Sequence, residues 1–72
     1  MPLAIEAVRQ IDAIFAAEAT INGKPAAERL AVRQRDIAPL VAALEAWMRA
    51  ERAKLSRHND IAQAMDYMLK RW

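Results

Sequence analysis

Helix-breaking residues occur at only three places in this 72-residue chain: Pro2, residues 22–25 and Pro39. Between these places, seventeen alanines and many Leu, Arg, Glu and Gln residues favour helix, because their side chains lose little rotamer freedom in it. No window shows the alternation of a strand, and no internal repeat is present. The sequence therefore predicts an all-α chain that is interrupted at fixed points.

The first predicted helix covers residues 3–21. Pro2 suits the position before it, because the first turn of a helix has no internal partner for the missing N–H. On a helical wheel, Glu6, Arg9, Ala13 and Thr20 face away from one broad apolar arc. We expect that arc to be the buried face, and it consists of Leu3, Ala4, Ala7, Val8, Ile11, Ile14, Phe15 and Ile21.

Residues 22–25 predict a stop and a restart, because Asn22 and Gly23 tolerate positive φ and Pro25 cannot easily continue a helix. The next helix is expected to begin at Pro25. Since Ala38 is a poor N-cap, we expect a kinked, nearly continuous helix through Pro39. Beyond it, Glu45 and Arg49 form an i,i+4 pair opposite the apolar stripe Leu40, Val41, Leu44, Trp47, Met48 and Leu55.

Residues 56–60 predict a second loop, in which Asn59 or Asp60 can cap the last helix. That helix sets Gln63, Asp66 and Lys70 opposite a stripe of Ile61, Ala64, Met65, Met68, Leu69 and Trp72. No stop signal follows the stripe, which predicts a fragment of a longer helical protein. The expected fold is all-α: one helical domain over residues 1–72, built as a hairpin or a small three- to four-helix bundle with a kink at Pro39.

Composition excludes several classes of protein. Without cysteine there is no disulfide framework and no thiolate metal site. A net charge of +2 is too small to be a nucleic-acid signature by itself. The chain has no apolar run long enough for a membrane span, and the segment from Met1 lacks the features of a signal peptide. We therefore expect a cytoplasmic protein without a membrane partner.

Two carboxylates, Glu18 and Glu51, fall within apolar stripes and invite a catalytic or metal-binding interpretation. The favoured alternative is an ion pair with an arginine such as Arg29 or Arg33, or access to solvent. Arg29 and Arg33 lie one turn apart and need an anion between them, for which we favour Glu18 over a phosphate. The single histidine, His58, lies in a predicted loop, so no catalytic, cofactor or metal residue is predicted.

The densest basic run consists of Arg49, Arg52, Lys54 and Arg57, which are the candidate nucleic-acid-binding residues. Such a run is more often a solvated helix face, particularly when a carboxylate such as Glu51 interrupts it. Elsewhere, the wheel places Tyr67 on the polar side of the last helix.

An ordered set of residues along the chain resembles the insertion sequence 66 family of bacterial transposases. The similarity covers nearly the whole chain and matches a helical stretch shortly before the segment that supplies the last catalytic acid. The residues that carry it are Glu18, Ile21, Gly23, Arg29, Arg33, Gln34, Pro39, Leu40, Val41, Leu44, Trp47, Leu55, Ser56, Ala64, Tyr67, Leu69 and Trp72.

The resemblance implies a parent enzyme in which three carboxylates hold two divalent metal ions, Mg²⁺ or Mn²⁺, for attack on phosphodiesters. No triad position is carried over to this chain: Asp36, Asp60 and Asp66 do not match, and Asp66 is expected to pair with Lys70. We expect the chain alone to be inactive, with the rest of the transposase as its partner and DNA reached through the parent. Two alternatives remain open: a module that associates with a copy of itself or a partner, and a weak binder of the DNA backbone.

Overall fold

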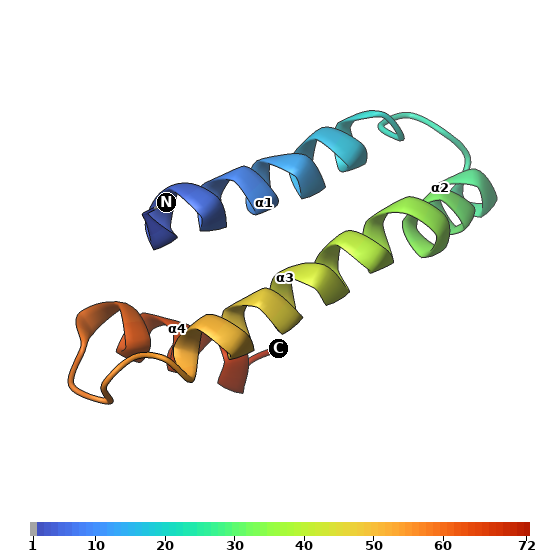
Figure 1. The fold of residues 1–72 in the computed structure, drawn as a ribbon. Helices are drawn as coiled ribbons and strands as arrows, with labels where there is room; N and C mark the ends of the chain where they lie inside the picture. The colour runs from blue at the N-terminus through green and yellow to red at the C-terminus, as the bar shows by residue number, and fades with distance from the viewer. Residues whose placement is uncertain (1) are drawn as a thin grey trace.

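The computed structural model describes residues 2–72; Met1, at which the expected domain begins, lies outside the described residues. The elements are α1 (Leu3–Ala19), α2 (Ala26–Val32), the π-helical turn η1 (Arg33–Ile37), α3 (Ala38–Arg52) and α4 (Asp60–Lys70), shown in Figure 1. Over residues 2–72 no strand is formed. The predicted all-α fold is confirmed.

Helix α3 is the centre of the arrangement. It runs alongside α1 in the opposite direction, and α4 packs against its C-terminal half (Figure 1). No Cα atom of α1 lies within 8 Å of a Cα atom of α4. The result is an elongated bundle with extents of 45 × 22 × 15 Å. Helices α1 and α4 each pack against α3, but their backbones do not pack against each other.

The first interruption lies where it was predicted, although α1 ends at Ala19 and not at residue 21. The chain then turns through Gly23, whose φ of 81° is the left-handed conformation that glycine adopts without steric cost. Ile21, only 1% exposed, anchors this turn in the core. Pro25 is the N-cap residue of α2 and not its first residue, as its extended ψ of 152° shows.

The second interruption confirms a nearly continuous helix and shows how Pro39 is accommodated. Pro39 has no N–H to donate to the carbonyl oxygen of Arg35, and its ring would crowd that carbonyl in a regular helix. The preceding turn widens instead, and the N–H of Ala38 donates to the carbonyl oxygen of Arg33, five residues earlier. The perturbation predicted at Pro39 is therefore the π turn η1.

Leu44 and Met48 of α3 and Met65 of α4 form the main cluster of buried side chains. The apolar stripe predicted for residues 40–55 is confirmed, because its members are buried or half-buried. The apolar side chains packed around the cluster are Leu3, Ile11, Ile14, Trp47, Leu55 and Leu69.

Part of the predicted core of α1 and α4 is wrong. Val8 and Phe15 of α1 are 56% and 67% exposed. In α4, the buried face contains Ala62 and Met65, whereas Ile61, Ala64 and Met68 are exposed, as is Trp72 beyond the end of the helix. The physical reason is that the backbones of α1 and α4 stay apart, with no Cα atoms within 8 Å of each other, so the facing flanks of the two helices are only partly covered.

The start of α4 follows the prediction. Asn59 is the N-cap, and its side-chain oxygen accepts hydrogen bonds from the backbone N–H groups of Ile61 at 2.8 Å and Ala62 at 3.3 Å. These bonds satisfy two of the donors that the first turn of a helix leaves free. The cap fixes the direction in which the chain leaves the loop and so places Ala62 and Met65 against α3.

Candidate nucleic-acid interface

The four candidate basic residues lie at the end of α3 and in the loop before α4. Arg49 and Arg52 belong to the last turn of α3, and Lys54 and Arg57 follow in residues 53–59. A surface that binds the DNA backbone needs cationic groups that are free to neutralise phosphates. The partners of each side chain therefore decide how much of this cluster can serve that purpose.

Two of these cations are held by carboxylates one turn away on α3. The Arg49 guanidinium donates to Glu45 Oε2 at 2.8 Å, which confirms the predicted i,i+4 pair. The Lys54 ammonium lies 3.3 Å from Glu51 Oε1. Glu51 therefore reaches a lysine of its own segment, and not Arg29 or Arg33.

Arg52 makes the most extensive contacts of the four. Its Nε and Nη2 donate to the two oxygens of Asp66 at 2.7 and 3.1 Å, and its Nη1 donates to the carbonyl oxygen of Leu55 at 3.1 Å. The expected pairing of Asp66 with Lys70 is wrong. The packing of α4 on α3 places the Arg52 guanidinium beside the Asp66 carboxylate, and Asp66 pairs with Arg52 instead. Hydrogen bonds from Arg52 lower the pKa of Asp66 and raise that of Arg52.

Arg57 differs from the other three. Its Nε lies 3.5 Å from His58 Nε2, and within residues 2–72 it forms no ion pair with a carboxylate. His58 lies in the loop, as expected, and its backbone N–H donates to the Ser56 hydroxyl at 3.2 Å. Of the predicted basic run, Arg57 is the side chain whose charge remains available to a phosphate.

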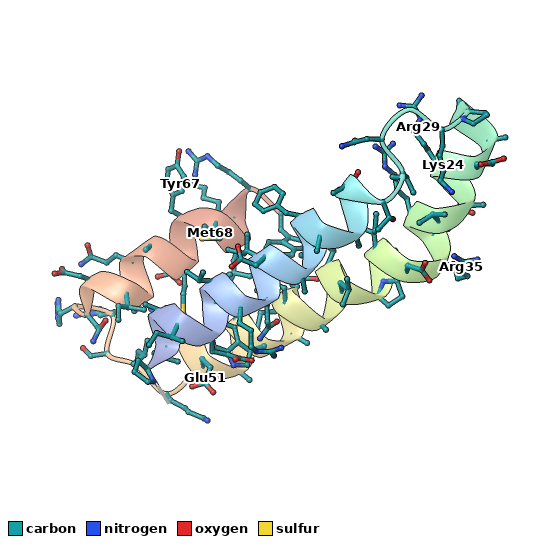
Figure 2. The ribbon with its side chains drawn as sticks, turned by 90° about the horizontal axis from the view of Figure 1, so that it is seen from above. Lys24, Arg29, Arg35, Glu51, Tyr67 and Met68 are labelled. Carbon is teal, nitrogen blue, oxygen red and sulfur yellow. The ribbon has the colours of Figure 1, made fainter. Side chains whose placement is uncertain are left out.

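A second group of cations lies at the opposite end of the molecule, beside the turn between α1 and α2. Both oxygens of Glu18 accept hydrogen bonds from Arg33 at 3.2 Å, so the favoured Glu18 ion pair is confirmed with Arg33 and not with Arg29. Arg29 and Lys24 both lie at this end (Figure 2), and Arg29 Nε is buried without a hydrogen-bond partner in the described chain. In the sequence, the one-turn spacing of Arg29 and Arg33 was the feature that predicted an anion such as Glu18 beside them.

The carboxylates of the chain are spread along the helices. Hydrogen bonds from Arg9 lower the pKa of Glu6 to about 2, and Arg35 lowers the pKa of Asp36. Residues 2–72 contain no group of three or more His, Cys, Asp or Glu side chains placed to hold a metal ion. The described residues therefore do not fit the two-metal centre that the resemblance implies for the parent enzyme.

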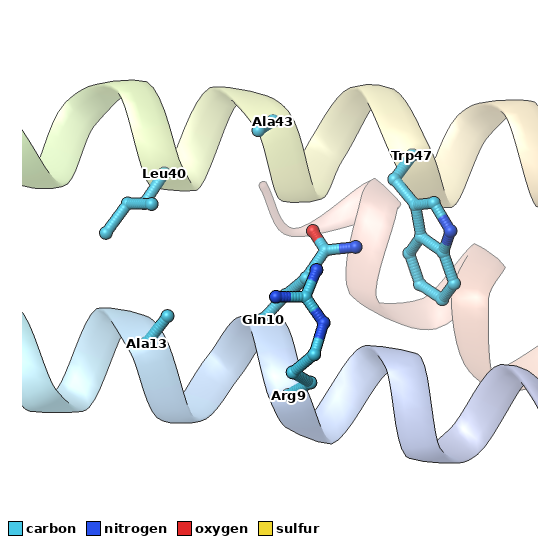
Figure 3. A pocket seen from close by; sticks show the side chains of 6 residues that line it. All are labelled: Arg9, Gln10, Ala13, Leu40, Ala43 and Trp47. Carbon is cyan, nitrogen blue, oxygen red and sulfur yellow. The ribbon is translucent and has the colours of Figure 1, made fainter.

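An open cavity of about 330 Å³ lies along one flank of α1 and α3 (Figure 3). Arg9 and Gln10 of α1 face Trp47 of α3 there, with Ala13, Leu40 and Ala43 beside them. Both Arg9 and Gln10 donate hydrogen bonds to Glu6. The polar groups of this cavity are thus engaged within α1, and they do not form an acid–base pair across it.

Comparisons with known proteins place the chain in a family. The model of the family described as "Transposase IS66 family" matches residues 1–72. A protein of Sinorhizobium fredii (strain NBRC 101917 / NGR234), named "Uncharacterized protein y4hP", is 49% identical over 71 residues, which are 99% of this chain and 13% of that protein. No solved structure matches.

The chain thus spans about an eighth of the length of this relative. Among the described residues, no helix is long and apolar enough to cross a membrane. The match over all 72 residues agrees with the resemblance carried by residues 18–72 of the sequence. The chain belongs to the IS66 family of transposases.

Proposed function

We propose that this chain is a non-catalytic helical segment of a DNA transposase, in which the phosphodiester chemistry belongs to other parts of the polypeptide. The observation that carries the proposal is the placement of its carboxylates. Six of them form ion pairs with Lys or Arg, and no three His, Asp or Glu side chains of residues 2–72 are grouped so that they could hold a metal ion. A two-metal mechanism requires carboxylates that converge on one point.

In this role the chain supplies a rigid spacer. The antiparallel α1 and α3 give it length, and α4 leaves the loop in a direction that the Asn59 cap and the Arg52–Asp66 ion pair fix. Such a segment holds the parts of the transposase on either side of it at a set distance and angle. The rest of the transposase is its proposed partner, DNA is reached through that parent, and the cytoplasmic location stays a prediction.

A hybrid protein tests this function. In it, the 71 matching residues of the Sinorhizobium fredii relative are replaced by those of this chain, and DNA cleavage and strand joining are measured with Mg²⁺ or Mn²⁺. We expect the hybrid to be as active as the unmodified relative, and the isolated 72-residue chain to be inactive. Cleavage or joining of DNA by the isolated chain would show that the proposal is wrong, and so would an inactive hybrid beside an active relative.

A second function, weak contact with the DNA backbone, is favoured by one observation. Arg57 carries a charge that no carboxylate of the described residues neutralises, whereas Arg49, Arg52 and Lys54 are ion-paired. We therefore propose that any DNA contact of this basic cluster is made mainly by Arg57. Its contribution is that of one phosphate contact, which by itself is weak and salt-dependent.

A further inference from the structure

The flanks of α1 and α4 that face each other form an apolar groove with α3 at its base. The cavity within it has a volume of about 140 Å³. We call this surface the α1–α4 groove; it is lined by Leu3, Ala4, Ala7, Ile11, Trp47, Met48, Ile61, Ala64, Met65 and Met68. All ten side chains are apolar, apart from the indole N–H of Trp47.

Both walls carry side chains spaced for packing against another helix. On α1, Ala4 and Ile11 line the groove. Val8 and Phe15 lie one helical turn beyond them and continue the strip at the rim, so that residues 4, 8, 11 and 15 follow at intervals of four, three and four. On α4, Ile61, Ala64 and Met68 follow at three and four. This alternation places them along one line of each helix, as in the seams of packed helices.

These seams are open to solvent in the described chain. Val8 is 56% exposed, Phe15 67%, Ile61 43% and Met68 39%. Exposed apolar residues that stand singly are ordinary, but a continuous strip on both sides of a groove marks a surface that is covered in the complete assembly. The core side chain Met48 at the base is already buried, so an occupant would add contacts to a formed surface.

We infer that the α1–α4 groove is covered by an amphipathic helix supplied by the remaining polypeptide of the transposase. This inference rests on the proposed function. In the relative, the matching segment is 13% of the protein, so most of the polypeptide lies outside it and is covalently joined to it. Tethering raises the effective concentration of such a helix far above that of a separate molecule.

The carboxylate of Asp12, beside the apolar strip on α1, indicates the charge that the covering helix should carry. Asp12 lies between Val8 and Phe15 on α1, is exposed, and forms no ion pair among residues 2–72. An acid left unpaired beside an apolar strip favours a Lys or Arg at the edge of the incoming helix. The occupant is therefore a helix with apolar residues at intervals of three and four and a cation beside them.

Cysteine labelling tests the inference, because the chain has no cysteine of its own. The single variant Val8→Cys places a thiol at the α1 rim of the groove, one turn from Ala4, and Met68→Cys places one on the α4 wall. Leu30→Cys is the matched control, since Leu30 is 56% exposed, as Val8 is, but lies on α2, away from the groove. Maleimide labelling, located by peptide mass spectrometry, is compared between the isolated chain and the hybrid with the Sinorhizobium fredii relative. We expect at least tenfold slower labelling at residues 8 and 68 in the hybrid, with residue 30 unchanged.

Equal labelling rates at residues 8 and 68 in the two proteins would overturn the inference. Protection that grows with the concentration of the isolated chain, and does not grow further in the hybrid, would also overturn it by identifying a second copy as the occupant. If the hybrid does not fold, cysteines at the aligned positions of the relative itself give the same comparison. Loss of DNA cleavage with protection retained would instead contradict the proposed function alone.

Discussion

The guanidinium of Arg52 joins the end of α3 to the middle of α4, with its Nε 2.7 Å from Oδ1 of Asp66. Within residues 2–72 it is the ion pair that links these two helices, since the pairs of Arg49 and Lys54 are formed with residues three or four positions away. The same guanidinium donates to the Leu55 carbonyl oxygen and so also orders the start of the loop.

Replacing Asp66 with Asn should lower the melting temperature at pH 7 and not at low pH. Because Arg52 lowers the pKa of Asp66 in the folded chain, the pair stabilises the fold above the usual carboxyl pKa of 3.8. Its contribution is lost as the pH falls from there through the lowered pKa. Thermal melts followed by circular dichroism should show the gap between wild type and Asp66→Asn closing in that range.

Asp12→Asn is the control for this experiment, because Asp12 has no ion pair in the described chain. It should change the melting temperature little at either pH. A gap between wild type and Asp66→Asn that is the same at pH 7 and pH 2.5, a value chosen as roughly one unit below the usual carboxyl pKa, would contradict the role of the Arg52–Asp66 pair.

Met48→Ala should lower the free energy of unfolding by about 2 to 5 kcal/mol, because it leaves a cavity at the centre of the core. Met48 is 2% exposed, whereas Met68 is 39% exposed on the wall of the α1–α4 groove. Met68→Ala in the isolated chain should therefore cost under about 1 kcal/mol. Urea denaturation measures both; a larger loss for Met68→Ala would contradict the assignment of the core.

Asn59→Ala should lower the free energy of unfolding by about 1 kcal/mol, because the N–H groups of Ile61 and Ala62 lose their acceptor. Asn59→Ser keeps an oxygen in the capping position and should retain most of the stability. Urea denaturation of the two variants compares them directly. Equal losses for Ala and Ser would show that the side-chain cap does not stabilise α4.

Gly23→Ala should destabilise the chain by about 1 to 2 kcal/mol through backbone strain alone. The φ of Gly23 is +81°, and an added Cβ would meet no atom within 4 Å. Since space is free, the loss measures conformation and not a clash. Gly23→Asn should lose less, because Asn tolerates the left-handed region; equal midpoints for wild type and Gly23→Ala in urea would contradict the turn geometry.

Binding of the isolated chain to duplex DNA should weaken with salt, and Arg57→Gln should reduce the slope of log affinity against log salt by about 1. Arg49→Gln should reduce it less, because the Arg49 guanidinium already pairs with Glu45. Fluorescence anisotropy across a salt series measures both slopes. An affinity that does not depend on salt, or equal effects of the two substitutions, would contradict a phosphate contact made mainly by Arg57.

Local signals in the sequence predicted most of the fold. The breakers at residues 22–25, the Asn59 cap and the stripe from Leu40 to Leu55 act within one helix or turn, and the structure confirms each. Ion pairs within a helix, such as Glu45 with Arg49, were predictable for the same reason.

Properties that depend on how helices pack were harder to predict. A helical wheel shows that Val8 and Met68 lie on apolar faces, but not that the backbones of α1 and α4 stay too far apart for these faces to cover each other. The choice of Arg52 over Lys70 as the partner of Asp66 likewise depends on the position of α4 against α3. In the candidate interface, the charges and the Glu45–Arg49 pair were predictable from the sequence, whereas the neutralisation of Arg52 by Asp66 was not.

The π turn at residues 33–37 takes up one residue more than a regular helical turn would need. One residue corresponds to about 100° of rotation around a helix axis. Besides accommodating Pro39, the extra residue therefore sets the rotation of α2, with Leu30 and Arg29, relative to α3. The extra residue in this turn also fixes the direction in which α2 points from the end of α3, independently of the side chains that form the core.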